Sequence, residues 1–247
     1  MVRIPTLRER TLGVVRPLVL LHIGKTGGMS LKQLISQLDP PEQRRLDIAR
    51  IPTPLGHGAS RLQDWSAGER RRRFAFVFRE PAARYASGFA SRLRQGRPLK
   101  APGAVRWTGG EAAAFAFFAS ANDCFEALDA RDERLRSAAL FAMEVVTHVV
   151  QDHVFYLGGP EDWRGRSQRA YFFCPLDELH AQAHRFFIPG EHFDAAGVRK
   201  LLPVLHATPA ATEELSERAV RNLRAVRPAE FELYARLLDD YRARFAD

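Results

Sequence analysis

Short apolar runs alternate with helical patterns along the chain, and this alternation predicts the fold. Three runs have the length and composition of buried strands: residues 18–23, 74–78 and 170–174. Apolar positions at helical spacing follow each of them, within 30–38, 81–93 and 175–187. Strand–helix alternation of this kind is typical of a mostly parallel sheet flanked by helices. The sequence therefore predicts an α/β layer fold.

Further helical patterns lie within residues 111–120 and 133–150. Near the C-terminus, five apolar side chains fall on one helical face: Phe231, Tyr234, Leu238, Tyr241 and Phe245. We expect this face to be buried against the rest of the protein.

Two segments, 40–68 and 95–110, are rich in proline, glycine and polar residues and are expected to be loops. Both are longer than the usual connections of a compact domain, which favours a functional role for them. The chain shows no internal repeat and no interdomain linker. We therefore expect one domain that spans residues 1–247.

Composition narrows the class of protein only modestly. Of 247 residues, 46% are hydrophobic and 27% are charged, as in ordinary globular proteins. The net charge of +8 favours anionic partners, but 33 of the 37 basic residues are arginines, a bias typical of genome composition. No zinc finger or aromatic-plus-basic signature accompanies the charge, so we expect no nucleic-acid partner.

Cysteine usage and the N-terminal sequence indicate the compartment. The two cysteines, Cys124 and Cys174, are too few for a disulfide framework or a zinc site, and we expect no metal. The N-terminus shows no secretory signal pattern. The longest apolar stretches are far shorter than the roughly 20 residues that a spanning helix needs. These observations predict a cytoplasmic protein without a membrane span.

The most informative segment is the turn HIGKTGGMSL, residues 22–31, between a predicted strand and a predicted helix. Main-chain N–H groups at a helix start, freed of Cβ crowding by Gly27 and Gly28, can bind an anionic group. Lys25 adds a full positive charge, and the hydroxyls of Thr26 and Ser30 add donors. This combination favours a cradle for phosphate or phosphosulfate over a tight turn with an exposed lysine.

The turn differs from a Walker A loop, in which glycine precedes the Gly-Lys pair by five residues. That position is Val19 here, and the additional glycines follow Lys25 instead. No aspartate ends a following strand to help to hold Mg²⁺. A P-loop kinase is therefore disfavoured.

A second block, residues 74–89 (FAFVFREPAARYASGF), places an arginine at a strand end and a serine two helical turns later. Arg79 offers a forked donor that suits a phosphate, and Ser87 can supply a hydroxyl to the same anion. An arginine and a serine at this spacing are a weak signal alone. Downstream of the glycine-rich turn they become a strong one.

Together the two blocks resemble the carbohydrate sulfotransferases related to the heparan-sulfate 2-O type and their bacterial relatives. The first loop of that family is usually written HIPKTGGTS, and this chain has Gly24 for the proline and Met29 for a threonine. The proline loss is expected to make the turn less rigid. The second block resembles the family's strand–RDPxxRxxS–helix element, with Glu80 for the aspartate and with Arg84 kept. Weaker similarities cover 151–159, 171–187 and 227–238.

The resemblance implies a P-loop-like three-layer fold and the co-substrate 3′-phosphoadenosine 5′-phosphosulfate. It implies in-line transfer of the sulfuryl group, without a metal, to a hydroxyl or amine of a carbohydrate-type acceptor. Lys25 would stabilise the charge that develops on the departing phosphate, and Arg79 and Ser87 would bind the 3′-phosphate. The implied donor-binding residues are Lys25, Thr26, Gly27, Gly28, Met29, Ser30, Arg79 and Ser87.

Acceptor activation needs a general base, and histidine supplies one most readily. The family's 2-O branch places a histidine in a Gly-His context between the two blocks, and Gly56-His57 matches that position. His57 is therefore the expected base, His153 the second candidate, and Glu80 is expected to be structural. Two other function classes stay open: a nucleotide-dependent small-molecule kinase, and a non-catalytic binder of nucleotide or polyanion. The sequence does not identify the acceptor.

Overall fold

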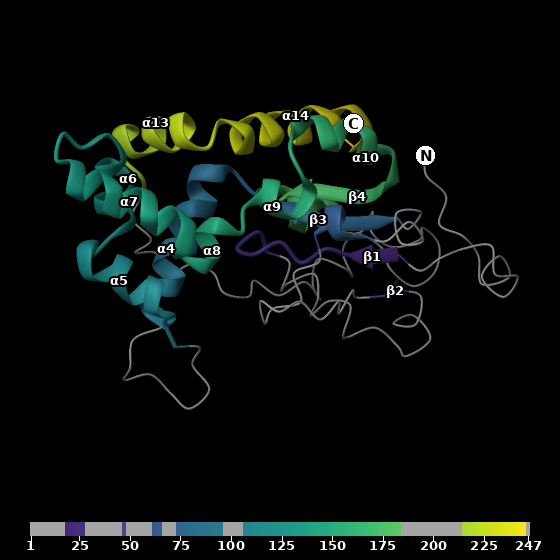
Figure 1. Ribbon diagram of the computed structural model, residues 1–247. Coiled ribbons are helices and arrows are strands. Elements are labelled where there is room, and N and C mark those ends of the chain that lie inside the picture. The colour runs from purple at the N-terminus through teal and green to yellow at the C-terminus, as the bar shows by residue number, and fades with distance from the viewer. Residues whose placement is uncertain are drawn as a thin grey trace, which may run out of the picture.

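A small parallel sheet lies beside a group of helices in the computed structural model of the chain (Figure 1). The structure describes residues 18–27, 46–47, 61–65, 73–95, 106–183 and 214–245. The sheet has the order β2-β1-β3-β4, and all of its described pairs are parallel. The strands are β1 (Leu18–Leu20), β2 (Leu46–Asp47), β3 (Phe74–Phe78) and β4 (Ala170–Pro175). The expected α/β class with a parallel sheet is confirmed.

The central strand β3 is buried over its whole length, as expected for a parallel strand covered on both faces. Its bounds coincide with the predicted run 74–78, and β4 differs from its prediction by one residue. β1 is shorter than predicted and ends at Leu20, although the Leu21 N–H still donates to the Ala75 carbonyl of β3. β2 was not expected, since it lies in the predicted loop 40–68 and exists through pairing with β1.

Helices form in the described parts of the predicted patterns, whereas the helices Ala121–Glu126, Pro160–Arg166 and Glu217–Val226 were not predicted. Pro81 is the first residue of α4, as its fixed φ favours. The predicted helix 133–150 is divided at Val146 into α7 and α8. The predicted helix 30–38 lies outside the described residues. The helices are α4 (Pro81–Gln95), α5 (Gly109–Phe117), α6 (Ala121–Glu126), α7 (Glu133–Val145), α8 (Thr147–Val150), α9 (His153–Leu157), α10 (Pro160–Arg166), α11 (Leu179–Gln182), α13 (Glu217–Val226) and α14 (Pro228–Phe245).

Four 3₁₀ turns complete the described elements: η1 (Leu62–Asp64), η3 (Ala127–Asp129), η4 (Ser167–Arg169) and η5 (Leu176–Glu178). In the predicted helix 175–187, η5 and α11 occupy the part that is described. Among the described residues, no helix is both long and apolar enough to cross a membrane.

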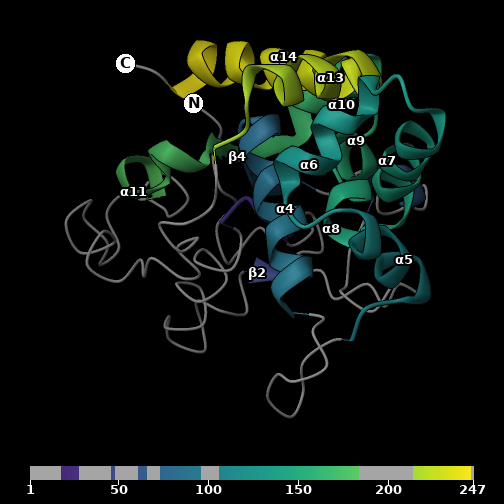
Figure 2. The ribbon, with the colours of Figure 1, turned by 90° about the vertical axis from the view of Figure 1, so that its left-hand side faces the viewer.

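Two hydrophobic cores underlie this arrangement. The first surrounds the sheet, where Trp163 of α10 packs edge-on against Phe76 and Phe173, and Tyr241 of α14 packs against Phe78. The second lies among α4, α5, α6, α7 and α13. Helices α13 and α14 lie along the top in both ribbon views (Figures 1 and 2). Helix α13 contributes Ala219 and Leu223 to the second core, and α14 contributes Leu233, Leu237 and Tyr241 to the first.

The buried face of α14 differs from the predicted one. The fully buried apolar positions are Leu233, Leu237 and Tyr241, whereas Phe231 and Tyr234 are only half-buried. The reason is that α14 contacts both cores. Phe231 packs against the helical core and Tyr234 against the sheet core. The buried surface of α14 is therefore wider than the predicted face, and these two residues lie at its edges.

Candidate functional site

The carboxyl ends of the parallel strands bring the two predicted blocks together. β1 and β3 are neighbours, with Leu20 opposite Ala75, and the Leu21 N–H donates to the Ala75 carbonyl at 2.9 Å. The turn 22–27 follows β1, and Arg79 directly follows β3. In open parallel sheets, ligands bind at this edge, beyond the carboxyl ends of the strands. The topology therefore places Lys25 and Arg79 at one edge.

The turn 22–27 contains two residues in the left-handed region of backbone conformation. Lys25 has φ of 67° and Gly27 has φ of 80°. A non-glycine residue in this region costs on the order of 1 kcal/mol, and such residues are common at ligand sites. The strain at Lys25 is thus a local sign of function.

The side chain of Thr26 is turned inward. It is fully buried, and its hydroxyl donates to the Ile23 carbonyl at 3.0 Å. In this structure the single proton of the hydroxyl is used within the turn, and its expected contact with a bound anion stays a prediction. A role of the Thr26 main-chain N–H stays a prediction.

Two glycines fit the turn closely to its surroundings. A Cβ on Gly27 would lie 2.3 Å from Leu176 Cδ1, so the turn approaches the segment after β4 as only glycine permits. A Cβ on Gly24 would lie 3.5 Å from His148 Nδ1 and 3.9 Å from the Tyr156 hydroxyl, which is ordinary contact. The expected loss of rigidity at Gly24 stays a prediction.

Two positive side chains, Arg79 and Arg94, lie near enough to Lys25 for their charges to act on it. Burial lowers the pKa of Lys25, and the nearby charges of Arg94 and Arg79 lower it further. Burial also lowers the pKa of Arg79, although Glu80 and Asp177 act in the opposite direction. No carboxylate of the described residues lies within 4 Å of Lys25, Arg79 or Arg94. Half-buried cations that lie near one another and have no ion-pair partner within 4 Å among the described residues form a candidate site for an anion.

The second block is built as a strand–cap–helix unit. The Glu80 carboxylate accepts the Ala83 N–H at 2.7 Å, and its carbonyl accepts the Arg84 N–H, so Glu80 caps α4 as expected of a structural residue. Ser87, two turns further on, is 2% exposed. The predicted contact of the Ser87 hydroxyl with a 3′-phosphate stays a prediction.

Arg84 performs a structural task. Its guanidinium is fully buried and donates to the carbonyls of His148, Gln151 and Val149, which end α8. These bonds satisfy carbonyl groups that the helix leaves open at its C-terminus. The resemblance alone did not indicate this role.

Four predicted site residues lie outside the described part of the chain. They are Gly28, Met29 and Ser30 of the glycine-rich turn, and His57, the expected base. Their roles stay predictions. The described site thus rests on the residues from Lys25 to Gly27, and on Arg79.

His153, the second candidate base, is enclosed inside the protein. It is fully buried, and Nδ1 lies 2.5 Å from Glu230 Oε1. Nε2 accepts the main-chain N–H of Arg79 at 3.3 Å. Since both ring nitrogens are engaged, His153 has no free lone pair for proton abstraction, and this alternative is wrong.

A buried polar network surrounds His153, and the sequence patterns did not reveal it. Burial raises the pKa of Glu230, but His153 and Arg84 outweigh burial and hold it below its ordinary value. Asp152 accepts a hydrogen bond from the Tyr85 hydroxyl at 2.9 Å. Burial and the two carboxylates raise the pKa of Tyr85. Asp152 lies between Gln151 and His153, and Glu230 between Arg227 and Glu232, so no local pattern marked these two carboxylates as buried.

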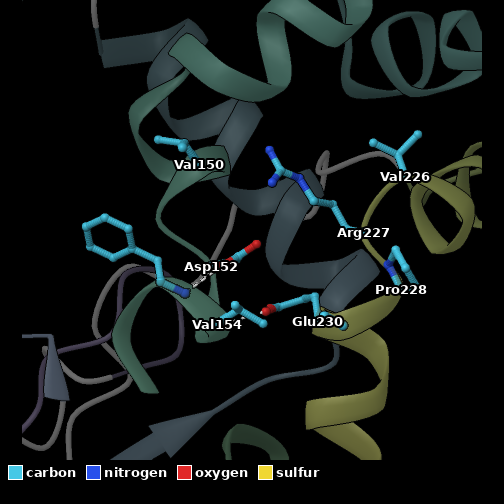
Figure 3. Close-up of a pocket in the computed structure, with 9 residues that line it drawn as sticks. Val150, Asp152, Val154, Val226, Arg227, Pro228 and Glu230 are labelled. Carbon is cyan, nitrogen blue, oxygen red and sulfur yellow. Dashed lines mark hydrogen bonds between the residues drawn. The ribbon is translucent and has the colours of Figure 1, made fainter. Parts of the chain in front are cut away.

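A pocket of about 370 Å³ opens beside this network (Figure 3). Asp152 and Val154 line it from the α9 side, and Arg227 and Glu230 from the α13–α14 junction. Arg227 donates to Glu144 at 2.5 Å, so its charge is already neutralised. None of the three clustered cations lines this pocket. It is therefore distinct from the candidate anion site.

The two cysteines are buried free thiols, and burial raises the pKa of each. Cys124 lies in the helical core and Cys174 in the sheet core, as expected of packing residues.

Comparison of the chain with family models, with curated proteins and with solved structures finds no match. The functional conclusion therefore rests on the site alone.

Proposed function

We propose that the protein is a sulfotransferase with a P-loop-like three-layer fold. It transfers a sulfuryl group from 3′-phosphoadenosine 5′-phosphosulfate to a hydroxyl or amine of a carbohydrate-type acceptor. The observation that carries the proposal is that Lys25 and Arg79 follow neighbouring parallel strands, are both half-buried, and form no ion pair with a carboxylate of the described residues. A nucleotide with anionic groups at both ends of its ribose suits two cations that approach from two strand ends.

The residues of the site would act mainly by position and charge, as in phosphoryl transfer. The co-substrate supplies an activated sulfuryl group. Lys25 stabilises the negative charge that develops on the leaving phosphate, and Arg79 binds the 3′-phosphate through its forked guanidinium. His57 is the proposed base for the acceptor. These roles agree with the lowered pKa of Lys25, because a nearby anion would restore its preference for the charged form.

Calorimetry tests the nucleotide assignment. Adenosine 3′,5′-bisphosphate is expected to bind more tightly than ATP–Mg²⁺, and Arg79→Ala to weaken the bisphosphate by about 10- to 100-fold. Adenosine 5′-phosphate, which lacks the 3′-phosphate, should lose much less. Arg164→Ala, an exposed arginine of α10, is the matched control. Tighter binding of ATP–Mg²⁺ would favour the kinase alternative instead, and equal losses for both adenosine nucleotides would refute the role of Arg79.

Turnover of the donor with a panel of saccharide acceptors tests the chemistry. Mass spectrometry should detect acceptors that have gained one SO₃ group, and His57→Ala should reduce this product by about 100-fold or more. An unchanged rate in that variant would remove His57 from the mechanism. Tight bisphosphate binding without turnover on any acceptor would favour a non-catalytic binder.

A further inference from the structure

The main chain of Arg79 is held by a side chain at the point where the sheet ladder stops. β3 pairs with β4 up to Phe78, which lies opposite Pro175. The next N–H, that of Arg79, donates to His153 Nε2 at 3.3 Å. His153 is fully buried. A histidine from α9 therefore takes the place of a strand partner at the first residue beyond β3.

Glu230 fixes the state of that histidine. Because Nε2 accepts a hydrogen bond, the proton of the neutral ring lies on Nδ1 and is donated to Glu230 Oε1, 2.5 Å away. The same carboxylate accepts the main-chain N–H groups of His153 at 3.1 Å and of Val154 at 3.0 Å. Figure 3 shows Glu230 extending from the start of α14 toward Val154. One carboxylate thus sets both the tautomer and the position of His153.

Glu230 also faces the helix that follows Arg79. Its Oε1 lies 3.6 Å from Arg84 Nε in the first turn of α4, and both side chains are fully buried. Arg84 therefore contacts the Glu230 carboxylate directly, and the main chain of Arg79 is connected to the same carboxylate through His153. Buried ion pairs add little stability over apolar packing, but they can enforce one geometry. The cluster fixes the strand–helix turn that carries Arg79.

We propose that His153 and Glu230 are positioning residues for Arg79. They orient its main chain at the end of β3, so that the guanidinium faces the same anion as Lys25. This inference rests on the proposed function, because it assigns the pair to the nucleotide site. Neither residue touches the ligand, and their effect on binding passes through Arg79.

Two substitutions of His153 separate positioning from packing. In His153→Asn the amide nitrogen lies near the place of Nδ1 and keeps the donor to Glu230, but the acceptor for Arg79 is lost. In His153→Gln the longer side chain brings an oxygen to the place of Nε2 and restores that acceptor. Both variants remove the same ring. A packing role predicts equal effects, and a positioning role predicts rescue by glutamine.

Calorimetry on the full chain supplies the first measurement. In His153→Asn the affinity for adenosine 3′,5′-bisphosphate should fall about tenfold, and that for adenosine 5′-phosphate less than about threefold. His153→Gln should stay within about threefold of wild type for both. His180→Asn, an exposed histidine of α11, is the matched control. Equal losses for the two nucleotides, or no rescue by glutamine, would overturn the inference.

A double-mutant cycle shows whether His153 acts through Arg79. In the Arg79→Ala background, His153→Asn should cause less than about a twofold further loss of bisphosphate affinity. Independent losses that multiply would contradict the positioning role.

Hydrogen exchange of the Arg79 amide gives a measurement that needs no ligand. In His153→Asn this amide should exchange about tenfold faster relative to the Val77 amide in the middle of β3, and near the wild-type rate in His153→Gln. An unchanged rate in His153→Asn would overturn the inference. If wild type does not distinguish the two nucleotides, the proposed function fails, and the exchange rate decides the anchoring of Arg79 by itself.

Discussion

The buried pair of Arg92 and Glu111 allows a quantitative prediction of stability. Glu111 accepts hydrogen bonds from Arg92 Nε at 2.7 Å, from the Thr108 N–H at 3.0 Å and from the Thr147 hydroxyl at 2.9 Å. The pair joins the last turns of α4, which carry Arg94, to α5 and to the start of α8. Its loss should therefore affect the support of the anion site as well as the fold.

The magnitude follows from the pKa of Glu111. Burial raises it, but the bonds from Arg92, Thr108 and Thr147 outweigh burial and lower it from its ordinary 4.5 to about 2. A pKa that is lower in the folded state stabilises the fold above the unfolded pKa, and this contribution is lost as pH falls. The difference corresponds to about 3 kcal/mol at neutral pH. The loss should occur between pH 4.5 and about pH 2.

The substitution Glu111→Gln should lower the free energy of unfolding by about 3 kcal/mol at pH 7. Urea unfolding followed by circular dichroism, at a series of pH values, measures the difference between the two proteins. That difference should shrink as the pH falls below 4.5, because the wild-type carboxyl also becomes neutral. The exposed pair of Arg136 and Glu133 supplies the control, and Glu133→Gln should cost less than about 1 kcal/mol. A difference that stays constant from neutral pH to pH 3 would refute this reasoning.

Three further predictions concern the glycine-rich turn. Lys25→Met should weaken adenosine 3′,5′-bisphosphate by about 10- to 100-fold in calorimetry; a loss under twofold would place Lys25 outside the site. Because burial, Arg94 and Arg79 lower the pKa of Lys25, wild-type affinity should be complete at low pH and fall as pH rises, at a lower pH than an ordinary lysine would give. Affinity that is flat up to the ordinary lysine pKa would contradict this. Gly27→Ala should lower the free energy of unfolding by about 1–3 kcal/mol, because Gly27 has a φ of 80° and an added Cβ would contact Leu176. Gly165→Ala is the control, since a Cβ there meets no atom within 4 Å. Equal stabilities of the Gly27→Ala variant and wild type would show that the turn adapts.

Local sequence was sufficient for the framework of the fold. The run FAFVF is buried on both faces and forms β3, and Pro81 begins α4 directly after it. The pairing of β1 with β3 then follows from strand–helix alternation. These features depend on short-range pattern and backbone preference, which the sequence displays directly. The same local reading placed Lys25 after one strand and Arg79 at the end of another, and the structure shows that these two strands are neighbours.

Local sequence was insufficient wherever a side chain meets a partner far along the chain. The Thr-x-x-Glu pattern at 108–111 signals a helix cap, which the structure contains, but not that Glu111 also pairs with Arg92. His153 was read as a candidate base because histidine titrates near neutral pH. Its partners, Arg79 and Glu230, lie 74 and 77 residues away.

The sequence by itself determined the alternation of strands and helices, the glycine-rich turn and the positive charges that frame the candidate site. Only the tertiary structure decided which of those charges lie near one another and which polar groups form hydrogen bonds inside the protein. It also decided that α14 packs against both cores. The physical reason is that backbone preference and hydrophobic period act over a few residues. Burial, hydrogen bonding and charge act over a few ångströms, between residues that only the folded chain brings together.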